Sequence, residues 1–204
     1  MKYSCESTGN KLFWISKRLF DVIVSLLLLP LLIIITIFLL FLNPYYNMGK
    51  LVFIQKRMGK NCEAFLAIKF RTMSHIEEIY RKFDEPIEID RITPLGKILR
   101  RTRIDELPQI LNVLRGDMSI IGPRPDYYVH ALEYMKNIDG YSDRHTIRPG
   151  ITGLSQVKLG YVENLETISK KVSIDNYYIQ NIGYITELKI ILRTILVIVR
   201  GIGK

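Results

Sequence analysis

The sequence predicts a predominantly helical α+β protein: an apolar membrane helix near the N-terminus, a small polar domain with short strands, and amphipathic helices at a membrane surface. Residues 22–42 carry no charge, the polar middle alternates between strand-like and helical patterns, and residues 188–204 combine apolar side chains with spaced basic ones. A chain of 204 residues has room for one ordinary domain and a small appendage. We therefore divide it into residues 1–45, 46–187 and 188–204.

Composition narrows the class of protein. The 29 Lys and Arg residues exceed the 20 Asp and Glu residues, and the net charge of +9 favours acidic partners such as phosphate groups, nucleic acid or anionic lipid. A hydrophobic content of 48% excludes a disordered chain. The two cysteines, Cys5 and Cys62, are too few for a disulfide scaffold or a Cys-only metal site, so we expect free thiols in a reducing, cytoplasmic compartment.

The uncharged run 22–42 is long enough for a membrane helix, because about 20 apolar residues cross a bilayer. Pro30, near its middle, removes one backbone hydrogen bond and favours a kink. Both flanks are basic and therefore prefer the cytoplasmic side; the basic residues are Lys11, Lys17 and Arg18 before the run, and Lys50, Lys56, Arg57 and Lys60 after it. We expect a re-entrant helix that bends at Pro30 and returns, and a single span kinked at Pro30 is the alternative.

The polar middle contains local signals for short elements. Leu107, Ile110, Leu111 and Leu114 recur at helical spacing, and Gly116 is a natural C-terminal stop. By the same reasoning we expect two strands joined by a turn, three helices, and two rigid loops that carry arginine. In chain order these are strand 51–55, turn 59–61, strand 64–70, helix 97–103, helix 107–116, loop 123–125, loop 148–150 and helix 163–180.

Residues 188–204 are expected to form a helix at the lipid headgroup boundary. Lys189, Arg193 and Arg200 fall within an arc of about 40° on a helix, and apolar residues occupy most of the remaining circumference. A basic stripe on an apolar helix is typical of interfacial helices. An ordinary helix packed on the core is the alternative.

The common nucleotide and metal motifs are missing from the sequence. It contains neither GxxxxGK[ST] nor GxGxxG, and neither HExxH nor GxSxG. The three histidines, His75, His130 and His145, are not spaced as a metal cluster. We therefore look for chemistry that uses carboxylates and cations.

The pair Asp105–Glu106, after three arginines, is the candidate reactive site. Pro108 suits the first turn of a helix, which places Asp105 at or near the N-cap, where helix N–H groups and arginines would stabilise its charged form. An ionised Asp can attack a phosphorus centre, and Glu106 could hold a Mg²⁺ ion. An Asp-Glu capping pattern without chemistry is the alternative.

Six blocks of sequence carry a resemblance to a known family. The blocks are residues 17–21 (KRLFD), 69–73 (KFRTM), 105–109 (DELPQ), 112–119 (NVLRGDMS), 122–125 (GPRP) and 148–153 (RPGITG). In this order they make the chain resemble the bacterial sugar transferases, the monotopic phosphoglycosyl transferases. The resemblance covers nearly the whole chain. It also implies a re-entrant helix bent at a proline, which agrees with the expectation from the flanking charges.

The resemblance implies a two-step reaction with a covalent intermediate. Asp105 would attack the β-phosphate of a UDP-sugar and expel UMP, and a polyprenyl phosphate, undecaprenyl phosphate in bacteria, would then take the sugar phosphate from Asp105. The resemblance further implies that Glu106 and Asp105 bind Mg²⁺. Substrate contacts are implied for Lys69, Arg71, Arg100, Arg124, Arg148, Gly150, Thr152, Gly153 and Asp175.

The resemblance also implies location and partners. The enzyme would be monotopic, on the cytoplasmic face of the bacterial inner membrane, in contact with its lipids, and a minimal catalytic form without extra N-terminal spans. It would perform the first membrane step in assembling a glycan such as exopolysaccharide, capsule or lipopolysaccharide. A second copy of the chain and downstream glycosyltransferases are further expected partners, and nucleic acid is not.

The chain departs from the family pattern at two places. Leu29 precedes Pro30 where many members have Ser, and residues 155–160 read SQVKLG where the family usually has AQVNGR. Lys158 would partly replace the missing arginine, in a region that could select the sugar. We expect an N-acetylated or diamino sugar, with glucose and galactose as alternatives.

Two other classes of function compete with the enzyme. A membrane-attached nucleic-acid binder would explain the charge of +9, but it needs a recognition helix or an aromatic platform that the sequence does not offer. A non-catalytic scaffold of a glycan assembly complex would explain both apolar segments. It leaves the context of Asp105 and the two Pro-Arg loops without a purpose.

Overall fold

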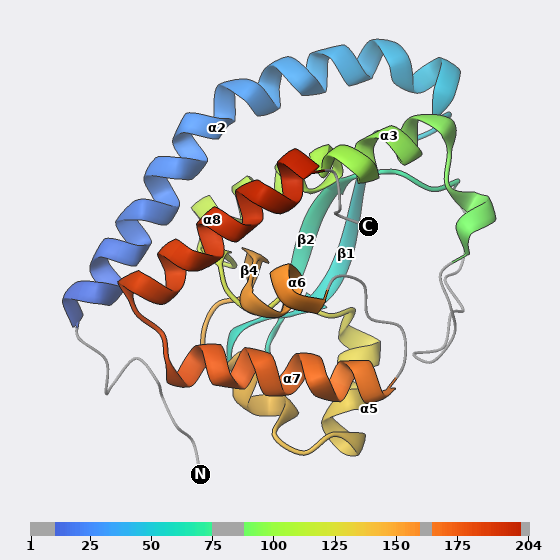
Figure 1. Cartoon of the computed structure of the whole chain (residues 1–204). Coiled ribbons are helices and arrows are strands. Elements are labelled where there is room, and N and C mark those ends of the chain that lie inside the picture. Colours follow the sequence, from blue (N-terminus) through green and yellow to red (C-terminus); the bar gives the residue numbers. More distant parts are fainter. Residues whose placement is uncertain (1–10, 75–87, 160–164, 201–204) are drawn as a thin grey trace.

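The computed structural model describes residues 11–74, 88–159 and 165–200, and within them it confirms a mostly helical α+β fold (Figure 1). Cys5, His75 and the side chain of Arg200 lie outside this description, while Cys62 is a free thiol. The helices are α2 (Lys11–Tyr46), α3 (Pro94–Thr102), α4 (Ile110–Arg115), α5 (Tyr128–Asn137), α6 (Leu154–Leu159), α7 (Leu165–Gln180) and α8 (Tyr184–Arg200). The strands are β1 (Val52–Met58), β2 (Ala64–Phe70), β3 (Ser119–Ile121) and β4 (Gly150–Thr152).

The N-terminal helix α2 is continuous through Pro30, so it is longer than the predicted segment 22–42 and does not reverse at the proline. Proline bends a helix without having to end it, and Figure 1 shows α2 curving over the rest of the chain as an arch. Among the described residues it is the one helix long and apolar enough to cross a membrane, and 17% of its most apolar window is buried. Re-entry into one leaflet stays a prediction.

The first turns of α2 are fastened to the polar domain by buried polar contacts. Lys17 donates to the carbonyl of Ile121 (3.0 Å) and pairs with Glu187 of α8 (2.5 Å). Asp21 accepts from the Ser119 hydroxyl (3.0 Å) and the Ile120 amide (2.9 Å). These contacts explain the block 17–21 physically, because Lys17 and Asp21 hold α2 against β3 and α8.

The remainder of the buried face of α2 joins an apolar core. Leu32 and Leu39 pack with Phe70, Leu95, Leu99 and Ile110. The other faces of α2 are exposed and apolar; Leu27 and Phe41, for example, are 73% and 72% exposed. Such a continuous apolar surface is larger than a soluble monomer normally shows.

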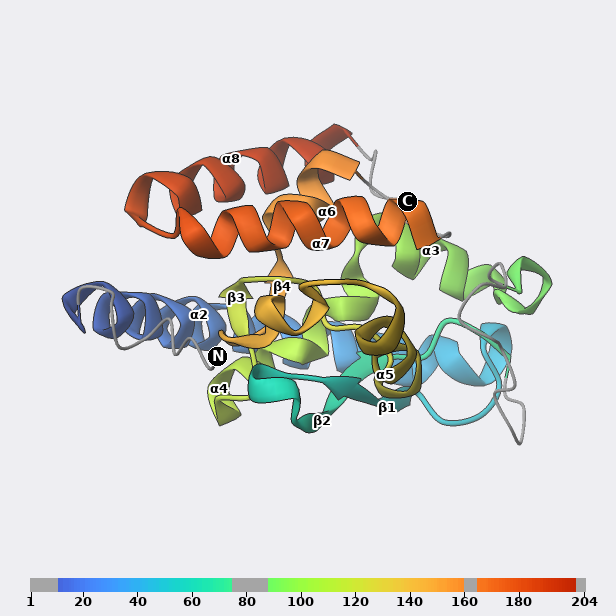
Figure 2. The same cartoon turned by 90° about the horizontal axis from the view of Figure 1, so that it is seen from below.

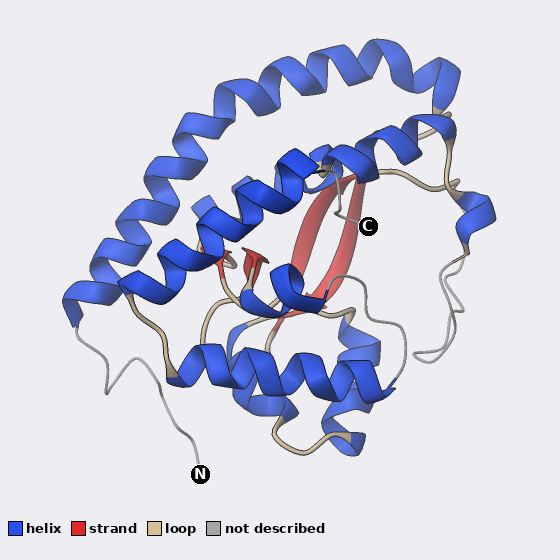
Figure 3. Ribbon diagram, in the orientation of Figure 1, coloured by secondary structure: helices blue, strands red, loops and turns tan. Residues whose placement is uncertain are grey.

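Two small sheets support the domain (Figure 3). β1 and β2 form an antiparallel hairpin in which Val52 is opposite Phe70 and Met58 is opposite Ala64. Both predicted strands are confirmed, although β1 extends beyond residue 55 to Met58. Strands β3 and β4 pair in parallel, with Ser119 opposite Gly150.

The helices after the hairpin follow the predictions with shifted ends. Thr93 caps α3, because its hydroxyl accepts from the Gly96 amide (3.0 Å), and the helix is 94–102 instead of 97–103. The predicted helix 107–116 is divided into a 3-10 segment, Ile104–Gln109, and α4, which ends at Gly116 with φ 94° as expected of a glycine stop. α7 and α8 lie on one side of the molecule, with β1, β2 and α4 on the other (Figure 2).

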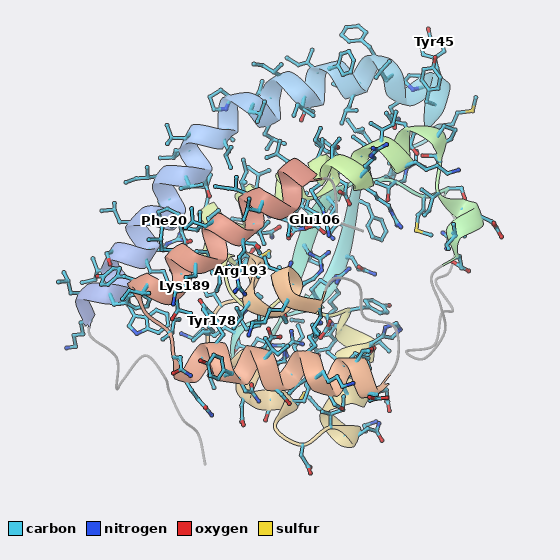
Figure 4. All side chains as sticks on the ribbon, viewed as in Figure 1. Phe20, Tyr45, Glu106, Tyr178, Lys189 and Arg193 are labelled. Carbon is cyan, nitrogen blue, oxygen red and sulfur yellow. The ribbon has the colours of Figure 1, made fainter. Side chains whose placement is uncertain are left out.

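Helix α8 begins at Tyr184 and not at residue 188, and it has two different faces. Ile190 and Glu187 point inward and are buried. Ile185, Leu188, Leu192 and Ile195 are 52–72% exposed, and Lys189 and Arg193 are exposed beside them (Figure 4). The helix therefore packs on the core and also presents an apolar and basic outer face.

The Lys17–Glu187 pair gives a test of how α2 is held. We expect Lys17→Ala to lower the free energy of unfolding by about 3–5 kcal/mol, because Glu187 is left buried without its cation. The thermal midpoint in detergent measures this effect. Lys11→Ala, which removes an exposed lysine from the same helix, is the matched control, and equal midpoints for the two variants would contradict the role of the pair.

Candidate active site

Asp105 and Glu106 lie in the 3-10 segment that directly follows α3. Arg103, the residue that joins the two elements, has φ 59° and occupies the N-cap position. Asp105 therefore lies near the N-cap, in the first turn of the segment, and Arg103 occupies the cap position itself. Glu106 is buried, and the Oδ1 atom of Asp105 is buried and accepts no hydrogen bond.

Glu106, labelled in Figure 4, contacts cations from three parts of the chain. Its Oε1 atom accepts from Lys69 Nζ of β2 (3.1 Å), and both of its oxygens accept from the guanidinium of Arg124, with Nη1–Oε2 at 3.0 Å. Arg103 Nη1 lies 4.0 Å from Oε1. Burial alone would raise the pKa of Glu106, but Arg124 and Lys69 hold it well below its ordinary value. Glu106 is therefore charged and binds its cations firmly.

Asp105 differs from its neighbour in its surroundings. Burial and the negative charge of Glu106 raise the pKa of Asp105, although Lys69, Arg124 and Arg100 oppose the shift. This direction corrects the expectation that helix N–H groups stabilise the charged form, because no N–H group reaches the buried Oδ1. A poorly solvated carboxylate beside several cations is suited to nucleophilic attack on a charged phosphate.

Lys69 is the third titratable group of the cluster. Burial lowers its pKa to about 8, and the Glu106 carboxylate limits that fall. Lys69 is therefore still mainly protonated at neutral pH and loses its charge in mildly alkaline solution. Together, Asp105, Glu106, Lys69 and Arg124 form a site that can bind a phosphate and present a carboxylate to it.

Comparison with known sequences agrees with this geometry. A profile of the bacterial sugar transferase family matches residues 12–201. The chain belongs to the bacterial sugar transferase family.

Three relatives show the range of the family. A UDP-N-acetylgalactosamine-undecaprenyl-phosphate N-acetylgalactosaminephosphotransferase of Aeromonas hydrophila is 36% identical over 92% of this chain and 44% of its own length. A UDP-glucose:undecaprenyl-phosphate glucose-1-phosphate transferase of Caulobacter vibrioides is 40% identical, over 88% and 68%. An exopolysaccharide production protein, PSS, of Rhizobium leguminosarum is 36% identical, over 88% and 92%. The chain thus spans less than half of the first relative and most of the third.

The structure brings four of the predicted site residues into one cluster: Lys69, Asp105, Glu106 and Arg124. Arg100 lies at its edge, since its charge acts on Asp105 while its Nε donates to the Thr72 hydroxyl (2.9 Å). These five residues come from β2, α3, the 3-10 segment and the loop after β3. The family motifs that contain them therefore meet at one place.

Arg71 and Arg148 are not brought into the cluster. The guanidinium of Arg71 donates to four backbone carbonyls, those of Asn47, Met48, Lys50 and Met73, and so holds the chain that follows α2. Arg148 donates to the carbonyl of Gly116 (2.8 Å). The bonds of Arg71 use its Nε, Nη1 and Nη2 atoms, so a substrate contact by Arg71 would have to replace some of them. The bond of Arg148 uses its Nε atom. The structure gives both arginines positioning contacts.

The glycines of the 148–153 block are needed for packing. A Cβ atom on Gly150 would lie 2.1 Å from the Gly122 amide nitrogen, and one on Gly153 would lie 2.1 Å from the Gly122 oxygen. Thr152 bonds to the Thr194 hydroxyl of α8 (2.7 Å). The block therefore joins β3, β4 and α8 tightly. Lys158, the expected substitute for an arginine, lies over the ring of Tyr177 (5.8 Å) and not in the cluster.

Asp175 belongs to a buried charge network that sequence reasoning missed. It pairs with Arg144 Nη2 (2.8 Å), which also donates to the carbonyl of Arg124 (2.7 Å). Asp126 accepts from Arg144, from Lys171 (2.5 Å) and from the Tyr141 hydroxyl (2.8 Å). The buried Asp175, the partly buried Asp126 and the buried cations Arg144 and Lys171 thus fix the loop that carries Arg124, two residues before Asp126.

The carboxylates of the cluster differ in how well they could hold a Mg²⁺ ion. In the described part of the chain, no three His, Cys, Asp or Glu side chains form a metal group. Both oxygens of Glu106 already bind cationic side chains, so Glu106 could ligate a metal only after releasing them. The buried Asp105 Oδ1, which has no donor, fits a Mg²⁺ ion that takes its other ligands from water and substrate phosphates.

The pKa directions predict a bell-shaped dependence of kcat/KM on pH. If Asp105 is the attacking group, activity should fall in acid at a higher pH than an ordinary Asp would give, because a nucleophilic carboxyl must be deprotonated. It should fall again above about pH 8, where Lys69 loses its charge. In Glu106→Gln the alkaline limb should move to lower pH, since the carboxylate that raises the pKa of Lys69 is gone. A profile that is flat from about pH 5 to about pH 9 would contradict this assignment.

Proposed function

We propose that the protein transfers a sugar 1-phosphate from a UDP-sugar to undecaprenyl phosphate or a similar polyprenyl phosphate, and releases UMP. The observation that carries this proposal is the buried, donor-free oxygen of Asp105 beside Lys69, Arg124 and Arg100. The names of the Aeromonas and Caulobacter relatives describe the same class of reaction.

The first step forms a covalent intermediate on Asp105. A carboxylate oxygen attacks the β-phosphorus of the UDP-sugar, the bond from that phosphorus to the oxygen shared with the α-phosphate breaks, and its electron pair leaves with UMP. Lys69 and Arg124 offset the negative charge that collects on the phosphate oxygens. A Mg²⁺ ion held by Asp105 would add further charge neutralisation.

The second step releases the sugar phosphate to the lipid. An oxygen of polyprenyl phosphate attacks the same phosphorus, and the bond to Asp105 breaks with its electrons returning to the carboxylate. The product is a polyprenyl diphosphate sugar. One site thereby serves a soluble donor and a lipid acceptor in turn, which corresponds to ping-pong kinetics.

The membrane elements support a lipid acceptor. The exposed apolar faces of α2 and α8, and Lys189 and Arg193 beside them, suit contact with a bilayer and its anionic headgroups. We propose that the enzyme works on the cytoplasmic face of the inner membrane, where the basic flanks of α2 prefer to remain. There the phosphate of the acceptor lies at the level of the headgroups.

Replacement of Asp105 tests the reaction. We expect Asp105→Asn to reduce UMP release by on the order of 10³-fold or more, in assays with Mg²⁺, polyprenyl phosphate and both UDP-glucose and UDP-N-acetylated sugars. Its thermal midpoint should not fall, because Oδ1 makes no hydrogen bond that the variant could lose. Asp139→Asn, at an exposed position, is the control. UMP release by Asp105→Asn at the wild-type rate would contradict the proposal.

A further inference from the structure

The last carbonyls of helix α4 are bound by arginine side chains from distant parts of the chain. The C=O groups at the end of an α-helix lack donors within the helix. At the end of α4, Arg18 Nη1 donates to the Val113 carbonyl (2.7 Å) and Arg18 Nη2 donates to the Leu114 carbonyl (3.0 Å). Arg148 Nε donates to the Gly116 carbonyl (2.8 Å). Cations at this end are also favoured by the partial negative charge of a helix C-terminus.

Arg18 belongs to the membrane helix α2 and stands just before the uncharged run 22–42. Its side chain is half-buried, and its planar guanidinium binds two successive carbonyls as a fork, which a lysine ammonium does not offer. The preceding residue, Lys17, is bound to β3 and α8. The first turns of α2 therefore contact α4 as well as β3 and α8.

The reactive pair lies on the same helical run as the carbonyls that Arg18 binds. The 3-10 segment continues directly into α4, because Gln109 and Ile110, at the junction, both have right-handed helical dihedral angles (φ −64° and −58°). Asp105 and Glu106 are in the first turn of this run, residues 104–115. The orientation of the run therefore determines where both carboxylates lie.

The 104–115 run is attached to the rest of the domain at its start, middle and end. Near its start, Glu106 pairs with Lys69 of β2. In its middle, the fully buried side chain of Asn112 bonds to two backbone groups of the same strand, at 2.8 and 3.0 Å. Loss of Arg18 would remove two hydrogen bonds from its end and leave the run freer to tilt about Asn112. Such a tilt would change the place of the reactive carboxylate relative to Lys69.

We propose that Arg18 is a positioning residue for the transfer reaction: from α2 it holds the C-terminal end of the 104–115 run and thereby orients Asp105. This inference rests on the proposed function, in which Asp105 is the nucleophile. A displacement of about 1 Å between reacting groups can cost on the order of 10²-fold in rate. Lys69 and Arg124 belong to β2 and to the loop after β3, so they are not carried along with the run. A defect at Arg18 is therefore expected in the rate of attack and not in donor binding.

The first half-reaction of the full-length protein tests this role. UMP release is followed by quench after mixing with Mg²⁺ and UDP-glucose or UDP-N-acetylgalactosamine, without lipid acceptor. In Arg18→Gln we expect the rate constant at saturating donor to fall about tenfold or more, while the KM for the donor changes by less than about twofold. Arg18→Lys keeps the charge without the fork and should recover part of the rate. Arg115→Gln is the matched control, because it removes an exposed cation from the same end of α4 and should react as wild type.

Hydrogen exchange provides a readout that does not depend on the reaction. In Arg18→Gln, peptides from residues 104–116 should exchange their amide hydrogens about threefold faster or more, because the end of the run has lost two attachments. Peptides from the hairpin, residues 52–70, should exchange as in wild type. Mass spectrometry of the digested protein measures both, and Arg115→Gln should show neither change.

Four results would overturn the proposal. The first is a wild-type rate in Arg18→Gln, and the second is an equal loss in Arg115→Gln, which would leave only a general effect of charge at the helix end. The third is a raised KM with an unchanged saturating rate, which would make Arg18 a substrate contact. The fourth is a lower thermal midpoint with faster exchange along the whole chain in both Arg18 variants, which would make the contact a general support of the fold.

Failure of the proposed function would look different. Wild-type protein would then release no UMP from either donor, while exchange in residues 104–116 would still rise in Arg18→Gln and not in Arg115→Gln. That result would keep Arg18 as the residue that positions the segment and would remove the reaction assigned to Asp105.

Discussion

The structure of the site depends on one buried carboxylate. Glu106 pairs with Lys69 of β2 and with Arg124 of the loop after β3, and Arg103 lies 4.0 Å from its Oε1 atom. An unpaired buried charge costs free energy, so the folded structure keeps these cations in contact with Glu106. Asp105, the next residue along the chain, is thereby placed among cations without being bonded to any of them through Oδ1. One carboxylate organises the charges and the other is left available to react.

A second set of charges makes this arrangement rigid. The loop with Arg124 is held at successive carbonyls: that of Pro123 by the Gly150 amide, that of Arg124 by Arg144, and that of Pro125 by Arg57. Asp126 then fastens the loop to Lys171 of α7. Asp126 and Asp175 balance Arg144 and Lys171, so this buried group carries no net charge. Helix α7, through Lys171 and Asp175, and the 3-10 segment Tyr141–His145, through Arg144, thus fix the backbone that carries the Arg124 side chain.

Much of the fold could be predicted because local patterns determine it. The apolar run predicts α2, and two strand-like segments on either side of a turn predict the hairpin. Gly116 follows the last residue of α4 and has the positive φ that glycine permits. The start of the segment at Ile104 could not be predicted, since it depends on a left-handed conformation at Arg103, which is not a glycine. Nor could the contacts of Lys17 and Asp21 with residues about a hundred positions away. The residues around Asp105 and Glu106 and the resemblance both pointed to this pair, whereas the contacts of Glu106 with Lys69 and Arg124 needed the fold.

The central claim is that Asp105 carries the sugar phosphate between two substrates. The most direct measurement is rapid acid quench of the purified protein with UDP-sugar and Mg²⁺ but without acceptor, followed by intact and peptide mass spectrometry. We expect a mass increase equal to one sugar phosphate, located on Asp105. The amount of modified protein should equal the UMP released, and the sugar phosphate should be lost on addition of polyprenyl phosphate. An unmodified protein that releases UMP only when the lipid is present would contradict the account, because the transfer would then be direct.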